Sequence, residues 1–213
     1  MMNDEERIIE SFHKLYYDWK MFGKTWGDTY WLGVRTQKCP LDLWIYQEII
    51  FDVKPDVTIE SGTACGGSAL FLASICDLVN NGEVITIDIV KDLRPSHPRI
   101  KQLLGSSTSE ETVQAVKSLI NGKGAVLVIL DSDHHKEHVL SELRIYSTFV
   151  TKGSYIIVED TNINGHPVLP EFGPGPMEAV EEFLKENDDF VVDKTREKLL
   201  LTMNPKGYLR KIN

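Results

Sequence analysis

The stretch VTIESGTACGGSALFLA, residues 57–73, decides the fold. Its first five residues are rich in β-branched side chains and predict a buried strand. Glycines at 62, 66 and 67 follow, and glycine lets the backbone turn sharply and approach a ligand closely. A helical pattern begins near Ser68, so the stretch predicts a strand–turn–helix unit in which the helix N-terminus presents free N–H groups to an anion. We expect a binding site at this turn.

Three further runs repeat the strand pattern and end in an acid: VITID (84–88), AVLVILD (125–131) and YIIVED (155–160). Helical patterns lie between the strands, at 68–79, 109–120, 136–150 and 176–187, and a weaker strand is expected at 100–104. This alternation predicts an α/β fold, with a mostly parallel sheet, right-handed crossovers and helices on both faces. FVVD (190–193) and LLLTMN (199–204) complete seven strands and predict an antiparallel hairpin at the C-terminal end of the sheet.

The N-terminal part has a different character. Apolar residues at helical spacing predict an amphipathic helix over 4–22, and a second helix is expected at 41–53. Between them, Trp26, Tyr30 and Trp31 stand among glycines in a predicted loop, whose rings we expect to pack onto the core or onto another subunit. A wall over the binding site is the alternative. We therefore expect an N-terminal segment, 1–54, packed on a Rossmann-like domain, 55–213.

Composition excludes several classes of protein. The 213 residues are 42% hydrophobic and 26% charged, as in an ordinary globular chain. A net charge of −9 without a long run of Lys or Arg disfavours nucleic acid as a partner. Three widely spaced cysteines form neither a disulfide framework nor a zinc site, and no basic secretory leader or membrane-spanning run is present. We expect a cytoplasmic protein with no membrane partner.

The glycine turn points to a cofactor that contains a nucleoside. Asp88 closes the second strand, where an acid accepts hydrogen bonds from ribose hydroxyls. Ala64 stands where the fingerprint G-x-G-x-x-G needs its second glycine, so a pyrophosphate is disfavoured. S-adenosylmethionine has no phosphate, its carboxylate suits the helix N-terminus, and Glu60 is placed to pair with its ammonium group. The plain alternative is an ordinary turn with an acid capping a strand end.

A group of acids predicts a metal site. ILDSDHH (129–135) and VEDTN (158–162) bring Asp131, Asp133, Glu159 and Asp160 to the ends of neighbouring strands. Crowded carboxylates repel one another unless a cation neutralises them, and oxygen ligands favour a hard divalent ion such as Mg²⁺. Helix capping is the alternative, but capping needs only one acid per helix.

Basic side chains adjoin these acids. His134, His135 and Lys136 are candidate catalytic groups, with His138 nearby, because imidazole titrates near neutral pH. A surface position without a role is the alternative for each. The Gly- and Pro-rich segment 161–176 follows a strand at the sheet edge where open α/β folds bind ligands, and it is a candidate lid with Glu171 at its centre. His166 within it is a candidate contact to substrate or metal, or a solvated loop residue.

Five segments carry a resemblance to a known family: TYWLGVRTQKCPLDLWIYQEII (29–50), the glycine turn (59–73), RPSHPRIKQLLGSS (94–107), LDSDHH (130–135) and VEDTNINGHPVLPEFGPGPMEAVEEFL (158–184). Together the sequence resembles the cephalosporin hydroxylase / rhamnosyl O-methyltransferase family over about residues 26–210. The resemblance implies a class I, Rossmann-like methyltransferase fold that uses S-adenosylmethionine. In the branch acting in cephamycin biosynthesis, it also implies Mg²⁺ bound by one Asp and an adjacent Glu–Asp pair.

These metal positions match Asp133, Glu159 and Asp160. In the related catechol-type O-methyltransferases the acid at the strand end takes the first place, which here is Asp131, so Asp131 remains the alternative to Asp133. The residues expected to bind the cofactor are Glu60, Gly62, Thr63, Gly66, Gly67, Ser68, Asp88, Ser106, Ser107 and Asp131.

We therefore expect an S-adenosylmethionine-dependent, Mg²⁺-assisted O-methyltransferase that forms a homo-oligomer. Its acceptor would be a hydroxyl of a small molecule, of the sugar or secondary-metabolite class. The metal would lower the pKa of that hydroxyl and align it with the methyl group. The alternatives are a non-catalytic or NAD-binding protein of the same fold, or an oxygenase, as the hydroxylase label of the family suggests.

Overall fold

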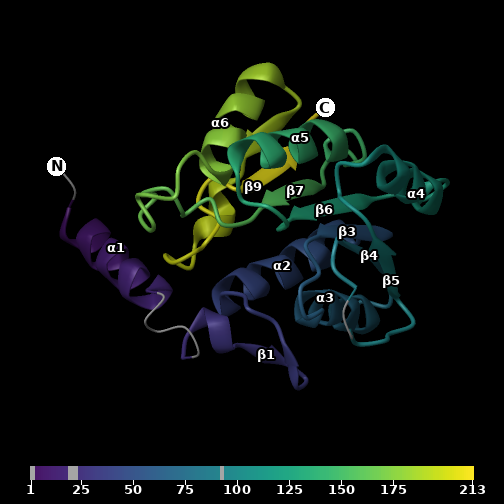
Figure 1. Ribbon diagram of the computed structural model, residues 1–213, viewed down its shortest axis with the longest axis horizontal. Coiled ribbons are helices and arrows are strands. Elements are labelled where there is room, and N and C mark those ends of the chain that lie inside the picture. The colour runs from purple at the N-terminus through teal and green to yellow at the C-terminus, as the bar shows by residue number, and fades with distance from the viewer. Residues whose placement is uncertain (1–2, 19–23, 92–93) are drawn as a thin grey trace.

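A seven-stranded sheet in the order β5-β4-β3-β6-β7-β9-β8 forms the centre of the protein, in a computed structural model that describes residues 3–18, 24–91 and 94–213 (Figure 1). The first five strands of this order are parallel, and β9 runs antiparallel to both β7 and β8. The strands are β3 (Val57–Ser61), β4 (Glu83–Asp88), β5 (Ile100–Leu104), β6 (Val126–Leu130), β7 (Tyr155–Val158), β8 (Phe190–Val192) and β9 (Tyr208–Lys211). The predicted α/β class and the antiparallel end of the sheet are confirmed.

Helices cover both faces of the sheet, which explains why the central strands are apolar on both sides. One core joins the sheet to α2 (Pro40–Val53) and α3 (Gly67–Leu78). The other joins it to α4 (Glu110–Ile120), α5 (Lys136–Tyr146) and α6 (Pro176–Glu186). Figure 1 shows the first pair below the sheet and α5 and α6 above it. Every residue of β3, β6 and β7 is buried, as their sequences predict.

The order in which strands are added to the sheet reverses between β3 and β6, although the two strands are parallel. From β3 the chain continues to β4 and β5 on one side, whereas β6 pairs with the other side of β3. Such a switch point leaves a crevice at the carboxyl ends of the two strands, where open α/β sheets bind ligands. The glycine turn follows β3 and the first acids follow β6, so the fold places both predicted sites at this crevice.

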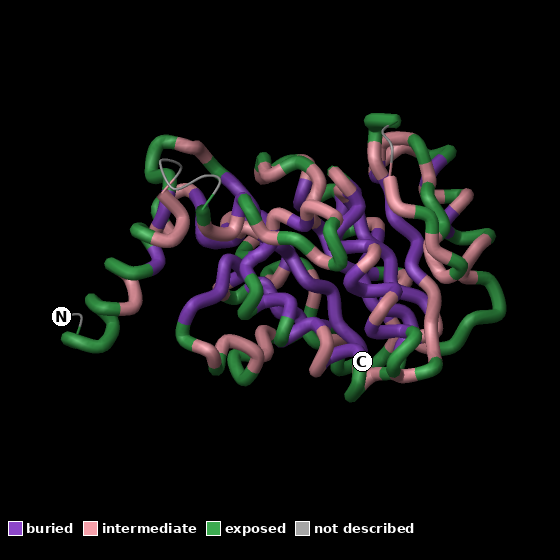
Figure 2. The backbone as a smooth tube through the Cα atoms, turned by 90° about the horizontal axis from the view of Figure 1, so that it is seen from below, coloured by how far each residue is buried: buried purple, intermediate pink, exposed green. Residues whose placement is uncertain are grey.

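The N-terminal part is more exposed than the rest. Helix α1 (Asp4–Tyr17) begins at a capping box between Asn3 and Glu6, and His13 is its only buried residue. Figures 1 and 2 show α1 projecting from the body, with its outer part mostly exposed. The predicted helix extends to residue 22, but residues 19–22 lie outside the described part.

The segment expected as a loop contains short regular elements. They are a 3-10 turn (Trp26–Asp28) and the hairpin of β1 (Tyr30–Trp31) and β2 (Val34–Arg35). Trp31 packs edge-on against Phe71 of α3 and donates to Ser74 Oγ at 3.0 Å. The packing role expected for this aromatic segment therefore holds for Trp31. Among the described residues, no helix combines the length and apolar character that crossing a bilayer requires.

The prediction of a strand at 199–204 is wrong. The last strand is β9, and residues 199–204 form an irregular tie to α2. Asp42 of α2 accepts hydrogen bonds from Thr202 Oγ1 at 2.5 Å and Met203 N at 2.9 Å, and Asn204 Nδ2 donates to Tyr46 Oη at 2.8 Å. Leu201 and Met203 are buried, so this run has the apolar pattern of a strand. Its polar backbone and side-chain groups are satisfied by a helix instead of a neighbouring strand.

Candidate functional site

The glycine turn is held tightly between β3, β4 and β6. Gly62 N donates to Ile87 O at 2.8 Å, and Gly62 has a φ of +87°, which favours glycine. A Cβ at this residue would lie 1.9 Å from the carbonyl oxygen of Asp131. Gly66, also at positive φ, precedes α3, and a Cβ on Gly67 would lie 2.3 Å from the carbonyl oxygen of Arg35. The turn therefore has room for backbone alone, as the sequence predicts.

Asp88 holds the glycine turn from the end of β4. Its Oδ2 accepts hydrogen bonds from the backbone N–H groups of Thr63 at 3.1 Å and Ala64 at 2.9 Å, and pairs with Arg94 at 2.9 Å. Its Oδ1 accepts from Val90 N at 2.9 Å. Asp88, which was expected to bind a ribose, lines a cleft together with Gly62. Its carboxylate also fixes the conformation of the turn, a role that the sequence did not predict.

Glu60 and Thr63 lie beneath the turn. Glu60 is buried and accepts a hydrogen bond from Thr86 Oγ1 at 2.6 Å. Burial raises its pKa, against the effects of Lys38 and of a hydrogen bond with Ser68. Thr63 Oγ1 lies 2.7 Å from Thr86 Oγ1. Glu60, Thr63 and Ser68 are all buried, and none of them lines the cleft of Gly62 and Asp88.

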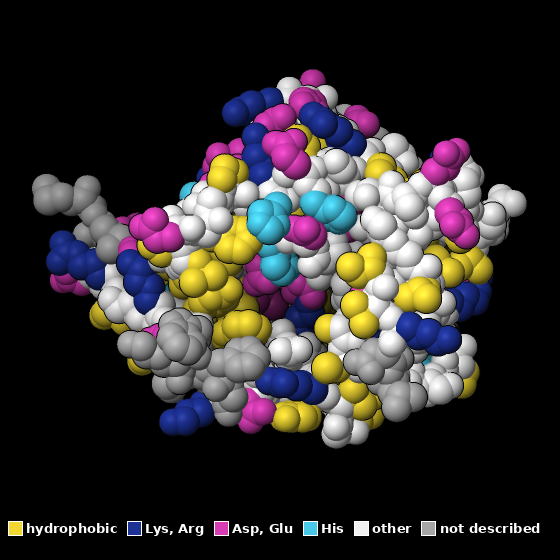
Figure 3. Space-filling view, viewed as in Figure 1, with side chains coloured by type: hydrophobic (Ala, Val, Ile, Leu, Met, Phe, Trp, Pro, Cys, Tyr) yellow, Lys and Arg dark blue, Asp and Glu magenta, His cyan; other side chains and the backbone are white. Residues whose placement is uncertain are grey.

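A cleft of about 610 Å³ opens between the glycine turn and the strand ends. Figure 3 shows histidine and acidic side chains gathered around a hollow on this face. The volume is that of a site for one small molecule. The predicted site residues that line it are Gly62, Asp88, Ser106, Ser107, Asp131, Asp133, His134 and His135.

One wall of the cleft contains a buried acid. Glu142 of α5 is fully buried and accepts a hydrogen bond from Ser132 Oγ at 2.8 Å. His138 Nε2 lies 3.2 Å from both Ser107 Oγ and Ser132 Oγ, and Glu142 raises the pKa of His138. Ser107 and His138 are therefore held as one unit at the cleft.

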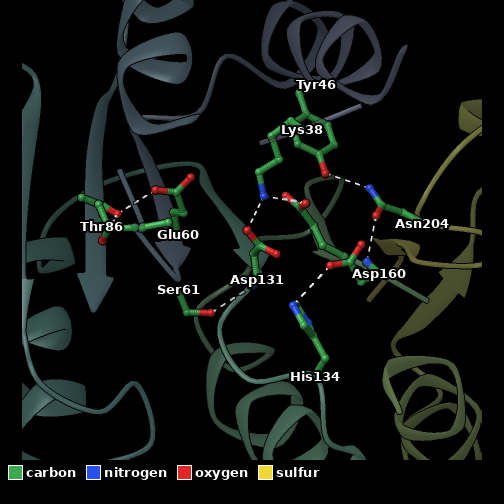
Figure 4. Close-up of polar contacts among 12 residues, drawn as sticks. Lys38, Tyr46, Glu60, Ser61, Thr86, Asp131, His134, Asp160 and Asn204 are labelled. Carbon is green, nitrogen blue, oxygen red and sulfur yellow. Dashed lines mark hydrogen bonds and ion pairs between the residues drawn. The ribbon is translucent and has the colours of Figure 1, made fainter. Parts of the chain in front are cut away.

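Three of the four acids predicted to converge, Asp131, Glu159 and Asp160, lie together, but around a lysine (Figure 4). Lys38 Nζ donates to Asp131 Oδ2 and, at 2.6 Å, to Glu159 Oε2. Asp160 faces the cluster from the other side, and His134 Nε2 lies 3.2 Å from Asp160 Oδ2. One ligand atom each from Asp131, His134 and Asp160 lies within 4.8 Å of the other two, a spacing that suits a shared metal ion.

Burial and mutual repulsion perturb this cluster. Burial raises the pKa of Glu159 well above its usual value, and Asp131 adds to that rise. Burial also raises the pKa of Asp160, which His134 opposes. Among the described residues, Oε1 of Glu159 is buried without a hydrogen-bond partner. A buried carboxylate oxygen without a partner is costly unless a cation binds it, so the residues present fit a metal ion.

Three residues near the cluster point elsewhere. Asp133 Oδ1 accepts hydrogen bonds from His135 N at 2.8 Å and from the His135 ring at 2.6 Å. Half of the Asp133 side chain is exposed. His135 is exposed and lies against Phe172, and Lys136 pairs with Glu182 of α6 at 2.5 Å. Of the candidate catalytic groups, the structure brings only His134 into contact with the acid cluster.

The segment 161–176 folds over one side of the cleft as a compact loop. Asn164 Nδ2 and His166 Nε2 both contact Glu178 Oε1 of α6, at 3.1 Å and 2.8 Å. His166 therefore faces α6, while Phe172 of this loop lines the cleft. The loop also reaches the N-terminal helix, because Asn162 Nδ2 lies 2.9 Å from His13 Nε2.

Sequence reasoning missed Lys38. It lies between β2 and α2, more than ninety residues from Asp131, and its side chain is 6% exposed. Asp131 and Glu159 raise its pKa, although burial alone would lower it. Its sequence surroundings, with Arg35, Thr36 and Gln37 directly before it, are polar and do not distinguish it from a surface lysine. Nothing in them identifies the acids with which Lys38 pairs.

Three features of this protein are expected of a Rossmann-like methyltransferase. They are the reversal of strand order between β3 and β6, the glycine turn, and the acid cluster at adjoining strand ends. Solved structures share this fold. The one described as "CmcI-N160 apo-structure" has a TM-score of 0.67 at 18% identity, over 87% of this chain and 76% of that chain. "cmcI-D160 Mg-SAM" also has a TM-score of 0.67, at 19% identity, over 87% and 77%.

The chain belongs to the Rhamnosyl O-methyltransferase/CmcI family, whose profile matches residues 23–212. It is 38% identical over 211 residues to the rhamnosyl O-methyltransferase of Mycobacterium leprae (strain TN), which covers 96% of this chain and 90% of the relative. The rhamnosyl O-methyltransferase of Mycobacterium tuberculosis (strain H37Rv) is 39% identical over 212 residues, 96% of this chain and 85% of that relative. The family predicted from the five sequence segments is thus confirmed.

Proposed function

We propose that the protein is an S-adenosylmethionine-dependent O-methyltransferase, assisted by Mg²⁺, that methylates a hydroxyl of a small molecule carrying a sugar. The relatives named as rhamnosyl O-methyltransferases support the reaction and point to a deoxysugar hydroxyl. The description of a solved structure with the same fold, "cmcI-D160 Mg-SAM", names both proposed cofactors.

One observation carries this proposal. The glycine turn after β3 and the acid cluster after β6 and β7 open onto adjoining parts of one crevice, and Asp131 lines the same cleft as Gly62 and Asp88. Methyl transfer needs a donor and an acceptor oxygen in line, a few ångströms apart. A nucleoside-type site beside a hard-metal site provides this arrangement, whereas an NAD-dependent enzyme has no need for the acids.

Asp131, Glu159 and Asp160 are the proposed metal ligands. Asp131 replaces Asp133 in this set, because the Asp133 carboxylate faces His135 while the Asp131 carboxylate faces the cluster. All three supply oxygen, which Mg²⁺ prefers. When bound there, the ion would polarise an acceptor hydroxyl and lower its pKa.

The remaining residues have roles that follow from their positions. The N–H groups at the start of α3 and the buried carboxylate of Glu60 suit the carboxylate and ammonium ends of S-adenosylmethionine. Asp88 fixes the turn and Ser106 and Ser107 line the cleft beyond it. His134, in contact with Asp160, is placed to take the proton from the acceptor hydroxyl. The loop 161–176, through Phe172, excludes water from the cleft.

Isothermal titration calorimetry with S-adenosylmethionine, with and without Mg²⁺, tests the cofactor site. We expect micromolar binding to the wild type and at least tenfold weaker binding to Asp88→Ala. Asp77→Ala is the matched control, because Asp77 lies on α3 outside the cleft and pairs with Arg99. Transfer of labelled methyl groups to rhamnose-bearing glycosides, with EDTA as the metal-free arm, tests the reaction.

Two results would contradict the proposal. Thermal stabilisation by NAD, with none by S-adenosylmethionine or its demethylated product, would favour the NAD-binding alternative. Methyl transfer that continues unchanged in EDTA, after removal of bound metal, would remove Mg²⁺ from the mechanism while leaving the methyltransferase assignment intact.

We also propose that the protein acts as a homo-oligomer. Ile8, Phe12 and Leu15 of α1 and Trp44 and Phe51 of α2 are large apolar side chains that are mostly exposed. Exposed large apolar side chains on helix faces are often covered at subunit interfaces. Sedimentation at increasing protein concentration tests this, and a monomer at all concentrations would contradict it. The cytoplasmic location, the lack of a nucleic-acid partner and the division at residue 54 stay predictions.

A further inference from the structure

Lys38 is a buried member of the acid cluster, held in place by hydrogen bonds from its side chain and its backbone. Its Nζ donates to one oxygen of Asp131 and one oxygen of Glu159, and its side chain is 6% exposed. Its backbone is held as well, because Thr29 Oγ1 donates to Lys38 O at 3.0 Å and accepts from Lys38 N at 3.1 Å. A lysine fixed at both ends is a permanent part of the site.

The ammonium group uses only half of each carboxylate. It contacts Oδ2 of Asp131 and Oε2 of Glu159, which leaves Oε1 of Glu159 buried without a partner among the described residues. His134 contacts Oδ2 of Asp160 on the other side of the cluster. The Tyr46 hydroxyl also acts on the Glu159 carboxylate, but Oε1 makes no hydrogen bond among the described residues and can therefore bind a second cation beside Lys38.

The charges define what that second cation must be. Asp131, Glu159 and Asp160 carry three negative charges when ionised, and Lys38 returns one positive charge. Counted over the three proposed ligands and Lys38, two negative charges remain for an ion bound beside the lysine, and the charge of the nearby Glu60 is common to every variant compared. In a buried site an unbalanced charge is strongly unfavourable, so the cluster with its lysine matches a divalent ion and the same cluster without the lysine matches a trivalent one.

We infer that Lys38 is a specificity-determining residue of the metal site: a resident counter-charge that aligns Asp131 and Glu159 and sets the site to accept one divalent cation. The inference rests on the proposed metal site and goes beyond it, because it assigns the choice of metal charge to a residue that binds no metal. Loss of Lys38 shifts the preference toward ions of higher charge, since the attraction gained from one added negative charge grows with the charge of the ion.

Metal affinity measured on protein stripped with EDTA tests the inference without any enzymatic readout. The Kd values of Mg²⁺ and La³⁺ are measured by calorimetry for the wild type, Lys38→Met and Lys38→Arg, and the ratio of the two Kd values is compared. Any general loosening of the site affects both ions and largely cancels in this ratio. Glu60, which also influences Lys38, is unchanged in every variant.

We expect Lys38→Met to shift the ratio at least tenfold in favour of La³⁺. Lys38→Arg, which keeps the charge, is expected to stay within about threefold of the wild type. Lys101→Met is the matched surface control, because Lys101 pairs with Glu83 at the far edge of the sheet and is partly exposed. A ratio in Lys38→Met within threefold of the wild type overturns the inference.

A second variant keeps the test decisive if Lys38→Met does not fold. Lys38→Met combined with Glu159→Gln removes both members of the ion pair and restores two net negative charges, so its ratio is expected to return to within threefold of the wild type. A tenfold La³⁺ preference in this double variant overturns the inference. Failure of the wild type to bind Mg²⁺ at all, with or without S-adenosylmethionine, overturns the proposed metal site together with the inference. Binding of Mg²⁺ with no effect of Lys38 overturns the inference alone.

Discussion

At the scale of single residues, Gly62 shows how the backbone sets the site. Gly62 and Gly122 both have positive φ, at +87° and +77°, but a Cβ on Gly62 would collide with the carbonyl of Asp131, whereas a Cβ on Gly122 meets nothing within 4 Å. We expect Gly122→Ala to cost about 1 kcal/mol of unfolding free energy, from backbone conformation alone. Gly62→Ala is expected to cost at least about 3 kcal/mol, because the strand end must move. Urea unfolding of both variants measures the difference, and equal losses would refute the close packing of β3 against Asp131.

His134 and His135 are neighbours with opposite surroundings, and they make a second pair of matched variants. His134 contacts Asp160 within the acid cluster, whereas His135 is exposed and contacts Asp133 and Phe172. We expect His134→Ala to lower kcat about 100-fold, the size of a general base or its partner, and His135→Ala to change it less than threefold. The Kd of Mg²⁺, measured in parallel, separates loss of the base from loss of metal. A larger effect of His135→Ala would place the reacting group on the outer side of the cleft.

Side-chain direction is the part of the site that the sequence could not provide. The strand–acid pattern correctly indicated that the acids after β6 and β7 meet, because parallel strands end at one edge. It did not decide which of Asp131 and Asp133 faces the acid cluster, since β6 ends at Leu130 and both acids lie beyond the regular strand. Lys38 has no local pattern at all. It lies in the connection between β2 and α2, and it meets the acids only through the tertiary structure.

At the scale of elements, the prediction succeeded where an apolar run forms a central strand and failed where burial has another cause. β3, β4 and β6 lie within a residue or so of their predicted ranges, because parallel strands covered on both faces are apolar. β5 also matches its predicted range, although this edge strand has no buried residue. Residues 201–204 are buried as well, yet polar groups tie them to α2, and Leu200 beside them is exposed. The apolar pattern of a sequence indicates that a segment is buried, but it does not indicate which neighbour forms the hydrogen bonds of its backbone.

The docking of α1 is expected to depend on pH. Burial lowers the pKa of His13 to about 4, whereas an exposed His titrates near 6.5. Below pH 6.5 the undocked state therefore binds a proton that the docked state excludes, so docking weakens as pH falls from 6.5 toward 4 and is unaffected above 6.5. At pH 5 the loss is about 2 kcal/mol.

Amide hydrogen exchange across residues 4–17 at pH 7 and pH 5, corrected for intrinsic rates, measures this effect. His13→Gln, which keeps a polar group opposite Asn162 but does not titrate, is the control. Protection of α1 is expected to fall between the two pH values in the wild type and to change much less in the variant. Equal changes in both proteins would show that another group controls the docking of this helix.

At the scale of the whole molecule, a buried carboxylate takes three of the hydrogen bonds that join the C-terminal segment to the N-terminal half. Asp42 accepts hydrogen bonds from Thr202 Oγ1, Met203 N and Tyr208 Oη, at 2.5, 2.9 and 2.8 Å, across at least 160 positions of sequence. Asn204 comes two residues after Thr202 and adjoins the acid cluster, because its Oδ1 accepts a hydrogen bond from Asp160 N at 3.1 Å. The same tie thus supports both the end of the sheet and the backbone of a proposed metal ligand.

Asp42→Ala leaves three buried donors without an acceptor, and we expect it to lower the free energy of unfolding by about 3–5 kcal/mol. Thr202→Val removes one of these three bonds and also the bond that Asn204 N donates to Thr202 Oγ1 at 3.0 Å, and it is expected to cost about 2 kcal/mol. Urea unfolding followed by circular dichroism measures both, with an unchanged m-value if the chain unfolds as one unit. Because Asn204 links this tie to Asp160, Asp42→Ala is also expected to weaken Mg²⁺ binding more than Thr202→Val does. A stability loss below 1 kcal/mol in Asp42→Ala would mean that the apolar contacts of Leu201 and Met203 hold this segment without the carboxylate.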